Sequence, residues 1–127
     1  MITGIGTDIV NIARIKRIYT RYGTRFVNKT LSSKEKDIFN TLSEIQKPHY
    51  LAKRFAAKEA TAKALGTGFG KALGFREIEV TNNSKGKPIL TLLGKGAHLE
   101  NNLSIKAKSI SISDESDYAL AFVVLES

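Results

Sequence analysis

The chain has 127 residues, of which 42% are hydrophobic and 25% charged, and its formal net charge is +8. This length suits one domain over residues 1–127, and the absence of cysteine excludes disulfides, thiolate zinc sites and a cysteine nucleophile. No apolar run approaches the ~20 residues that span a bilayer, and residues 1–10 lack the features of a signal peptide, so we expect a soluble, cytoplasmic protein.

The positive charge is concentrated in the first part of the chain. Residues 1–76 hold 15 Lys and Arg against 5 Asp and Glu, whereas residues 77–127 hold 5 against 7. A basic surface of this kind attracts polyanions. The candidate partners are nucleic acid, a phosphate-rich cofactor and an acidic protein.

The first half of the chain predicts one strand followed by helices. Residues 1–10 are rich in β-branched side chains, which favours a strand, and residues 11–23 carry apolar side chains at helical spacing before Gly23. Ser32 and Glu35 have the spacing of a capping box, which predicts a short helix over residues 32–42. Pro48 suits the first turn of a long helix that ends near Leu65, with Gly66 beyond its end.

The second half predicts mainly strands. Residues 76–94 read as two strands joined by a polar turn, and residues 95–102 as a short helix. Residues 105–113 and 118–126 read as two further strands around a turn. The chain is therefore expected to be α+β, with an antiparallel sheet packed against the long helix and the shorter helices.

Two features offer weaker signals of function. His49 and His98 have no second histidine at ligand spacing, so a surface or half-buried position is expected for both. The glycine-rich loop over residues 66–74 has the spacing of neither a phosphate loop nor a dinucleotide-binding loop. A helix stop remains one interpretation, and an anion contact through backbone N–H groups at Gly66, Thr67 and Gly68 is the other.

Two carboxylates stand in unusual places. Asp8 lies within the first strand, on the face that it shares with Gly4 and Gly6, where another group could come close. Glu59 falls on the apolar side of the long helix at 100° per residue, so it must be paired, neutralised or metal-bound. Mg²⁺ typically takes one or two carboxylates and fills its octahedron with water and substrate phosphate oxygens.

Simpler interpretations of these two acids remain open. Glu59 and Lys63 could be an ordinary i,i+4 pair on an exposed helix. Asp8 could be the N-cap of the helix that follows the first strand. The spacing pattern alone does not decide between these interpretations and a shared cation.

Two stretches, "GIGTDIVNIARI" at residues 4–15 and "RFAAKEATAKALGTG" at residues 54–68, resemble the holo-acyl-carrier-protein synthase family of small 4′-phosphopantetheinyl transferases. The family pattern is a Gly-x-Asp followed downstream by Phe-x-x-Lys-Glu-x-x-x-Lys, here Gly6 to Asp8 and Phe55 to Lys63. The resemblance extends over nearly the whole chain. One departure is Asp114, which follows a Ser-Ile-Ser stretch where many members carry histidine.

The resemblance implies a reaction. The phosphopantetheine arm of coenzyme A moves to a serine of acyl carrier protein and 3′,5′-ADP leaves, with Mg²⁺ as cofactor and in support of fatty acid biosynthesis. It also implies a homotrimer whose active sites lie between subunits, and no nucleic-acid partner.

The resemblance assigns roles to single residues. Asp8 and Glu59 would hold Mg²⁺ and, with Lys63 at the transferring phosphate, would form the catalytic group. Arg54 and Lys58 would bind the 3′-phosphate or adenosine end of coenzyme A, unless they are solvated charges. Two candidates remain for the base that accepts the serine proton. One is a water activated by the metal, and the other is Glu59 acting through that water.

The basic first helix would then dock the acidic carrier protein. The residues expected to do so are Arg14, Arg17, Arg21, Arg25 and the apolar Phe26. A nucleic-acid-binding module explains the same charge, but the chain has no aromatic-rich strand for base stacking. A non-catalytic subunit that binds an acidic partner is the second alternative.

Overall fold

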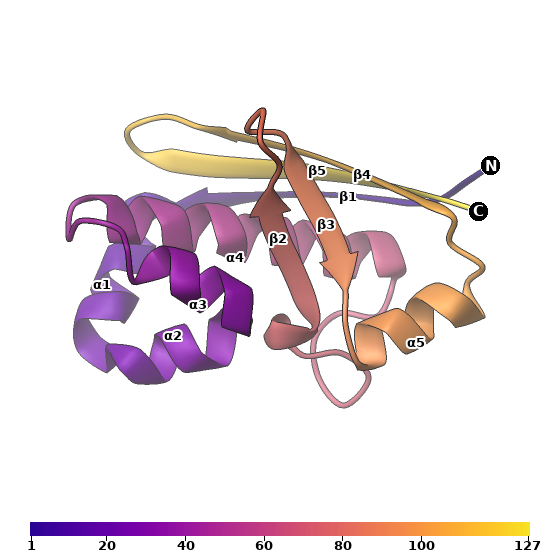
Figure 1. Cartoon of the computed structure of the whole chain (residues 1–127), viewed down its shortest axis with the longest axis horizontal. Coiled ribbons are helices and arrows are strands. Elements are labelled where there is room, and N and C mark those ends of the chain that lie inside the picture. The colour runs from indigo at the N-terminus through magenta and orange to yellow at the C-terminus, as the bar shows by residue number, and fades with distance from the viewer.

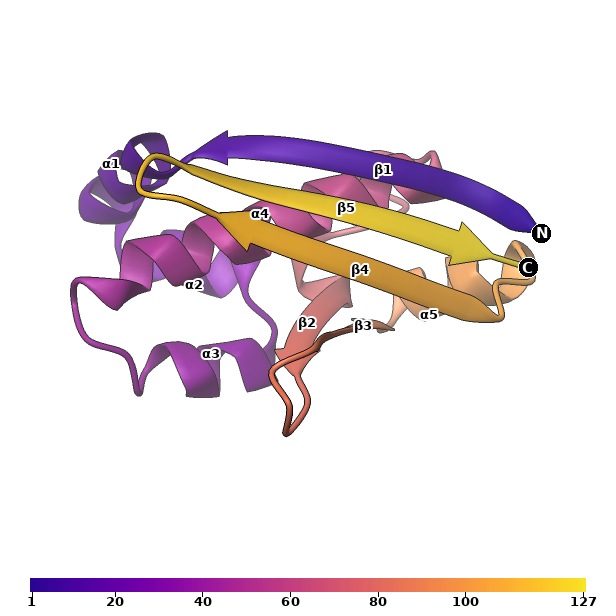
Figure 2. The same cartoon turned by 90° about the horizontal axis from the view of Figure 1, so that it is seen from above.

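The computed structural model describes all 127 residues. Its larger sheet has three antiparallel strands in the order β1-β5-β4. These strands are β1 (Ile2–Asn11), β4 (Ala107–Asp114) and β5 (Tyr118–Glu126). Figure 2 shows this sheet with helix α4 (Gln46–Leu65) beneath one face and no other element over the opposite face. The first and last strands of the chain are neighbours, so both termini lie at the same end of the molecule (Figure 1).

The remaining elements lie around the other sides of α4 (Figure 1). They are α1 (Ile12–Tyr22), α2 (Thr24–Thr30), α3 (Ser33–Phe39), a 3-10 turn η1 (Phe75–Glu77), β2 (Ile78–Asn82), β3 (Pro88–Leu92) and α5 (Lys95–Asn102). Strands β2 and β3 form a separate antiparallel hairpin. The predicted α+β class, with antiparallel strands packed against a long helix, is confirmed, and the strands form two separate sheets.

Two glycines let β1 rest directly on the backbone of α4. A Cβ atom added at Gly4 would lie 1.9 Å from the carbonyl oxygen of Ala64, and one at Gly6 would lie 1.9 Å from that of Ala60. The close approach predicted for this face of β1 is thereby confirmed. Since side chains alternate along a strand, Asp8 lies on the same face and is directed toward α4.

The helix α4 is buried on nearly all sides. Small residues such as Ala52, Ala56 and Ala60 are fully buried, and they pack with buried residues of β5, among them Ala121 and Val123. The helix ends at Gly66, which takes the left-handed conformation at φ 77°. That conformation is the usual helix stop and favours glycine, as the sequence predicts.

The outer face of the large sheet is apolar and uncovered within the chain. Ile5 and Ile9 of β1 are 60% and 61% exposed, and Leu120 and Phe122 of β5 are 40% and 43% exposed. Patches of contiguous exposed apolar side chains mark interaction surfaces in soluble proteins. No helix of the structure has the length and apolar character needed to cross a membrane.

The sequence and the structure agree on the starts of α3 and α5 and differ at α1 and α2. The capping box of Ser32 and Glu35 is present at the start of α3. The side chain of Asn11, and not that of Asp8, caps α1 by accepting the N–H of Arg14 at 3.0 Å. Helix α2 was not predicted, because Gly23 at φ 54° stops α1 and α2 begins directly after it.

Candidate active site

The structure brings Asp8 of β1 and Glu59 of α4 together with Lys63, one helical turn beyond Glu59. The Nζ of Lys63 donates to Oδ1 of Asp8 at 3.1 Å and to the carbonyl oxygen of Thr7 at 2.9 Å. Glu59 makes no hydrogen bond or ion pair, so Lys63 is not its i,i+4 partner. The packing of Gly4 and Gly6 on the backbone of α4 sets this arrangement, because it fixes the position of β1 along the helix.

The two carboxylates repel each other. Partial burial raises the pKa of the Glu59 carboxyl above its ordinary value, and the charge of Asp8 raises it further. Lys63 and Arg14 act in the opposite direction. A cation between the carboxylates would relieve this repulsion.

The donor set suits Mg²⁺. No group of three or more His, Cys, Asp or Glu side chains lies together anywhere in the chain, which argues against a site made of protein ligands alone. Two neighbouring carboxylates, with Asp8 only partly exposed, leave most positions around an ion to water and substrate. Mg²⁺ at phosphate-transfer sites is held in this way.

Lys58 does not belong to this group, and the expectation that it binds coenzyme A or lies in solvent is wrong. Its side chain is fully buried and donates to Oε1 of Glu35 at 2.6 Å, and to the carbonyl oxygens of Phe75 and Ile78 at 2.9 and 2.6 Å. These three acceptors use all three N–H bonds of an ammonium group. Burial lowers its pKa, and the Glu35 carboxylate opposes that shift.

Arg54 lies on another side of α4 from Glu59, beside the β2–β3 hairpin. It is 4% exposed and donates through Nη2 to Oδ1 of Asn82 at 2.8 Å, and its guanidinium lies 4.4 Å from the ring centre of Tyr50. Its Nε atom is buried and has no hydrogen-bond partner. Buried donors rarely stay unpaired, so this atom is suited to receive an acceptor from a ligand.

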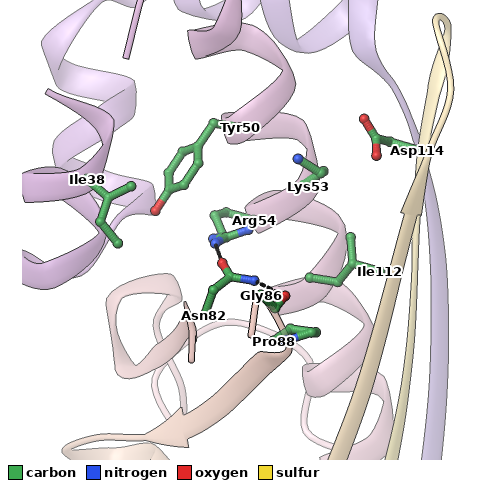
Figure 3. A pocket seen from close by; sticks show the side chains of 9 residues that line it. All are labelled: Ile38, Tyr50, Lys53, Arg54, Asn82, Gly86, Pro88, Ile112 and Asp114. Carbon is green, nitrogen blue, oxygen red and sulfur yellow. Dashed lines mark hydrogen bonds between the residues drawn. The ribbon is translucent and has the colours of Figure 1, made fainter. Parts of the chain in front are cut away.

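Arg54 borders a hollow of about 350 Å³ that sequence reasoning missed (Figure 3). The residues that line the hollow are Ile38, Tyr50, Lys53, Arg54, Asn82, Gly86, Pro88, Ile112 and Asp114. Cations, apolar side chains and an amide are its main features, and Asp114 lies at its β4 side (Figure 3). These residues come from five separate elements, α3, α4, β2, β3 and β4, and from the hairpin turn, so no local sequence motif could have revealed the hollow.

The hollow and the Asp8–Glu59 pair lie on different sides of the same chain. Asp8 belongs to β1 at one edge of the large sheet, whereas Ile112 and Asp114 belong to β4 at the other edge, with β5 between. Arg54, Lys58 and Lys63 therefore do not all lie around Glu59. Of these three cations, only Lys63 lies at the carboxylate pair.

The residues of the predicted glycine loop lie beyond the carboxylate pair. Ala64 packs on Gly4, and Asp8 lies four residues further along β1. The N–H of Gly66 donates to the carbonyl oxygens of Ala62 and Lys63, so it is not free for an anion. Thr67 and Gly68 are exposed, and their contact with coenzyme A stays a prediction.

The residues predicted for docking spread over more than one face of α1 and α2. Arg25 and Phe26 line a hollow of about 300 Å³ with Ile18, Tyr22 and Lys29. Arg17 and Arg21 line a second hollow of about 400 Å³ with Ala13, Lys16 and Thr20. Arg14 lies 5.9 Å from the ring centre of Phe55 and influences the Glu59 carboxyl. Of these cations, Arg14 links the basic surface to the carboxylate pair.

Comparisons with known proteins agree with this geometry. A family model of the 4′-phosphopantetheinyl transferase superfamily matches residues 4–123. The holo-[acyl-carrier-protein] synthase of Blochmanniella pennsylvanica is 47% identical over 126 residues, which cover 99% of each chain. The crystal structure of the holo-[acyl-carrier-protein] synthase from Neisseria meningitidis has a TM-score of 0.93 at 42% identity, with 100% of each chain covered.

A further solved structure carries a ligand. The holo-(acyl-carrier-protein) synthase from Bacillus anthracis, in complex with CoA (3′,5′-ADP), has a TM-score of 0.85 at 38% identity. The comparison covers 100% of this chain and 98% of that one. The chain therefore belongs to the 4′-phosphopantetheinyl transferase superfamily, and it is an enzyme of that class. The resemblance seen in residues 4–15 and 54–68 is confirmed.

Proposed function

We propose that this enzyme transfers the 4′-phosphopantetheine group of coenzyme A to a serine of apo acyl carrier protein and releases 3′,5′-ADP. The observation that carries the proposal is the convergence of Asp8, Glu59 and Lys63, two acids and one cation from β1 and α4. A diphosphate substrate needs such a combination, because it repels an oxygen nucleophile and must leave as an anion. We place the reaction in the cytoplasm, where it supplies fatty acid biosynthesis.

Asp8 and Glu59 would hold Mg²⁺, which when bound neutralises charge on the diphosphate. In the transfer, the serine oxygen forms a bond to the β-phosphorus while the bond from that phosphorus to the 3′,5′-ADP oxygen breaks. Lys63 is placed to stabilise the charge that develops on the phosphate oxygens. Glu59 would accept the serine proton through a water molecule.

The nucleotide end of coenzyme A fits the hollow beside Arg54. A 3′-phosphate would give the unpaired Nε of Arg54 an acceptor, and Lys53 supplies a second cation. Pro88 and Ile112 offer apolar surface to an adenine ring. These cations also offset Asp114, the acid that stands where many relatives carry histidine.

The separation of this hollow from the carboxylate pair supports a homotrimer with active sites between subunits. In one chain, a single coenzyme A would have to reach from the β1 edge of the sheet to its β4 edge. A second copy can place its own Arg54 hollow beside the first copy's Asp8 and Glu59. The uncovered apolar face with Ile5 and Phe122 would be buried between copies.

Mixed assemblies test this arrangement. The variants Glu59→Gln and Arg54→Met should each be nearly inactive alone. Equal co-expression of both should restore activity to about a quarter of the wild-type value, because a site then draws an intact carboxylate pair and an intact hollow from different copies. Turnover of the purified mixture measures this restoration. A mixture no more active than its parents would contradict shared sites.

The basic surface of α1 and α2 would receive the acidic carrier protein. Arg14 lies nearest the carboxylate pair and would bring the acceptor serine close to it, while Arg17, Arg21 and Arg25 extend the positive surface away from the site. Phe26 lines its hollow and is partly buried against the core, and the partner would cover its remaining exposed surface. Electrostatic steering of this kind raises the association rate and falls with salt.

A direct assay tests the proposed reaction. The full-length protein is mixed with coenzyme A, Mg²⁺ and apo acyl carrier protein, and the carrier protein is analysed by mass spectrometry. We expect the mass gain of one phosphopantetheine group on the acceptor serine, and no gain in a carrier protein whose serine is replaced by alanine. The absence of any gain with Mg²⁺ or Mn²⁺ would refute the proposed activity.

A further inference from the structure

Lys63 forms an ion pair with Asp8, the carboxylate that a divalent ion would need. Its Nζ lies 3.1 Å from Oδ1 of Asp8 and 2.9 Å from the carbonyl oxygen of Thr7. Glu59, the other member of the carboxylate pair, has no partner of its own. Lys63 is therefore the cation of the chain that forms an ion pair with this pair of carboxylates.

An ammonium group and a divalent ion cannot share this position. Mg²⁺ approaches carboxylate oxygens to about 2.0–2.1 Å, so an ion on Asp8 would lie in contact range of the Nζ and would repel it. The Lys63 side chain is 55% exposed, whereas that of Asp8 is 17% exposed. Since Lys63 extends into solvent on a flexible stem, it is the group that can move.

We propose that Lys63 acts as a stand-in cation, which neutralises Asp8 until a divalent ion arrives and then transfers its contacts to the phosphate oxygens of coenzyme A. This inference rests on the proposed function and adds to it the order in which Lys63 changes partners, from Asp8 to the phosphate oxygens. A divalent ion alone must displace Lys63 without giving it a new partner. Coenzyme A supplies that partner, so ion and coenzyme A favour each other's binding, and the coupling is reciprocal.

The test measures binding of Mn²⁺ to the full-length protein by electron paramagnetic resonance, with and without coenzyme A and in the absence of carrier protein. Mn²⁺ suits the same oxygen ligands as Mg²⁺. In Lys63→Met, we expect the free protein to bind Mn²⁺ about tenfold more tightly, within the usual range of coupling between sites. The enhancement of Mn²⁺ binding by coenzyme A should shrink by a similar factor.

Arg14→Met is the matched control, because Arg14 also acts on the Glu59 carboxyl but makes no contact with Asp8. Its Mn²⁺ affinity should rise by much less than that of Lys63→Met. Equal rises in the two variants would show a general charge effect and overturn the inference. An unchanged or weaker affinity in Lys63→Met would overturn it as well.

Glu59→Gln separates this inference from the proposed function. If Glu59→Gln abolishes Mn²⁺ binding while Lys63→Met leaves it unchanged, the carboxylates hold the ion and only the stand-in role fails. If Glu59→Gln leaves Mn²⁺ binding unchanged, the proposed metal site fails, and the role of Lys63 fails with it.

Discussion

Replacement of Lys58 by methionine should lower the free energy of unfolding by about 3–5 kcal/mol, the usual cost of removing one partner of a buried ion pair. Lys58 and Glu35 are both fully buried and lie 2.6 Å apart. Without Lys58, the Glu35 carboxylate keeps only the N–H groups of Ser32 and Val80, and the carbonyl oxygens of Phe75 and Ile78 lose a donor. Urea denaturation followed by circular dichroism measures the difference.

Two further variants control this experiment. Lys47 pairs with the exposed Glu44 at a similar distance, 3.0 Å, and ion pairs with a partner in solvent contribute little, so Lys47→Met should change the unfolding midpoint much less than Lys58→Met. Adding Glu35→Gln to Lys58→Met removes the stranded charge and should recover part of the lost stability. A Lys58→Met protein as stable as wild type would show that the pair does not hold α3 and η1 against α4.

The error about Lys58 has a physical origin. A helical wheel assumes one apolar side and one solvated side, which suits a helix on the surface. Helix α4 instead contacts the large sheet, α1 and β2, and its Lys58 donates to Glu35 of α3 and to Phe75 of η1. A lysine on what the wheel takes for the solvated side is then buried, and the sequence around residues 54–63 contains no sign that Glu35 would lie opposite it.

Local chemistry was predictable where neighbouring residues decide it. The Ser32 and Glu35 spacing identified the start of α3, and Gly66 identified the end of α4. The glycines beside Asp8 correctly indicated a close neighbour on that face, although the sequence could not identify it as α4. The buried ion pair of Glu35 with Lys58 and the hollow beside Arg54 depend on residues that are far apart in the chain. They could therefore be recognised only from the folded structure.

Replacement of Glu59 by glutamine should lower kcat/KM by about 10³-fold, or about 4 kcal/mol of transition-state stabilisation. The amide keeps the size of the side chain but removes the charge that would hold Mg²⁺ with Asp8. The loss should persist when Mg²⁺ is raised. Steady-state transfer to acyl carrier protein, measured over a series of Mg²⁺ concentrations, tests this expectation.

The fold should survive this change. Because the folded protein raises the pKa of Glu59, the ionised carboxyl costs stability, and this cost grows as pH rises above the ordinary pKa and through the raised one. Glutamine removes the cost, so Glu59→Gln should be at least as stable as wild type at neutral pH. Asp37→Asn, at an exposed position of α3, should change neither activity nor stability appreciably. Near-normal kcat/KM in Glu59→Gln would remove Glu59 from the catalytic group.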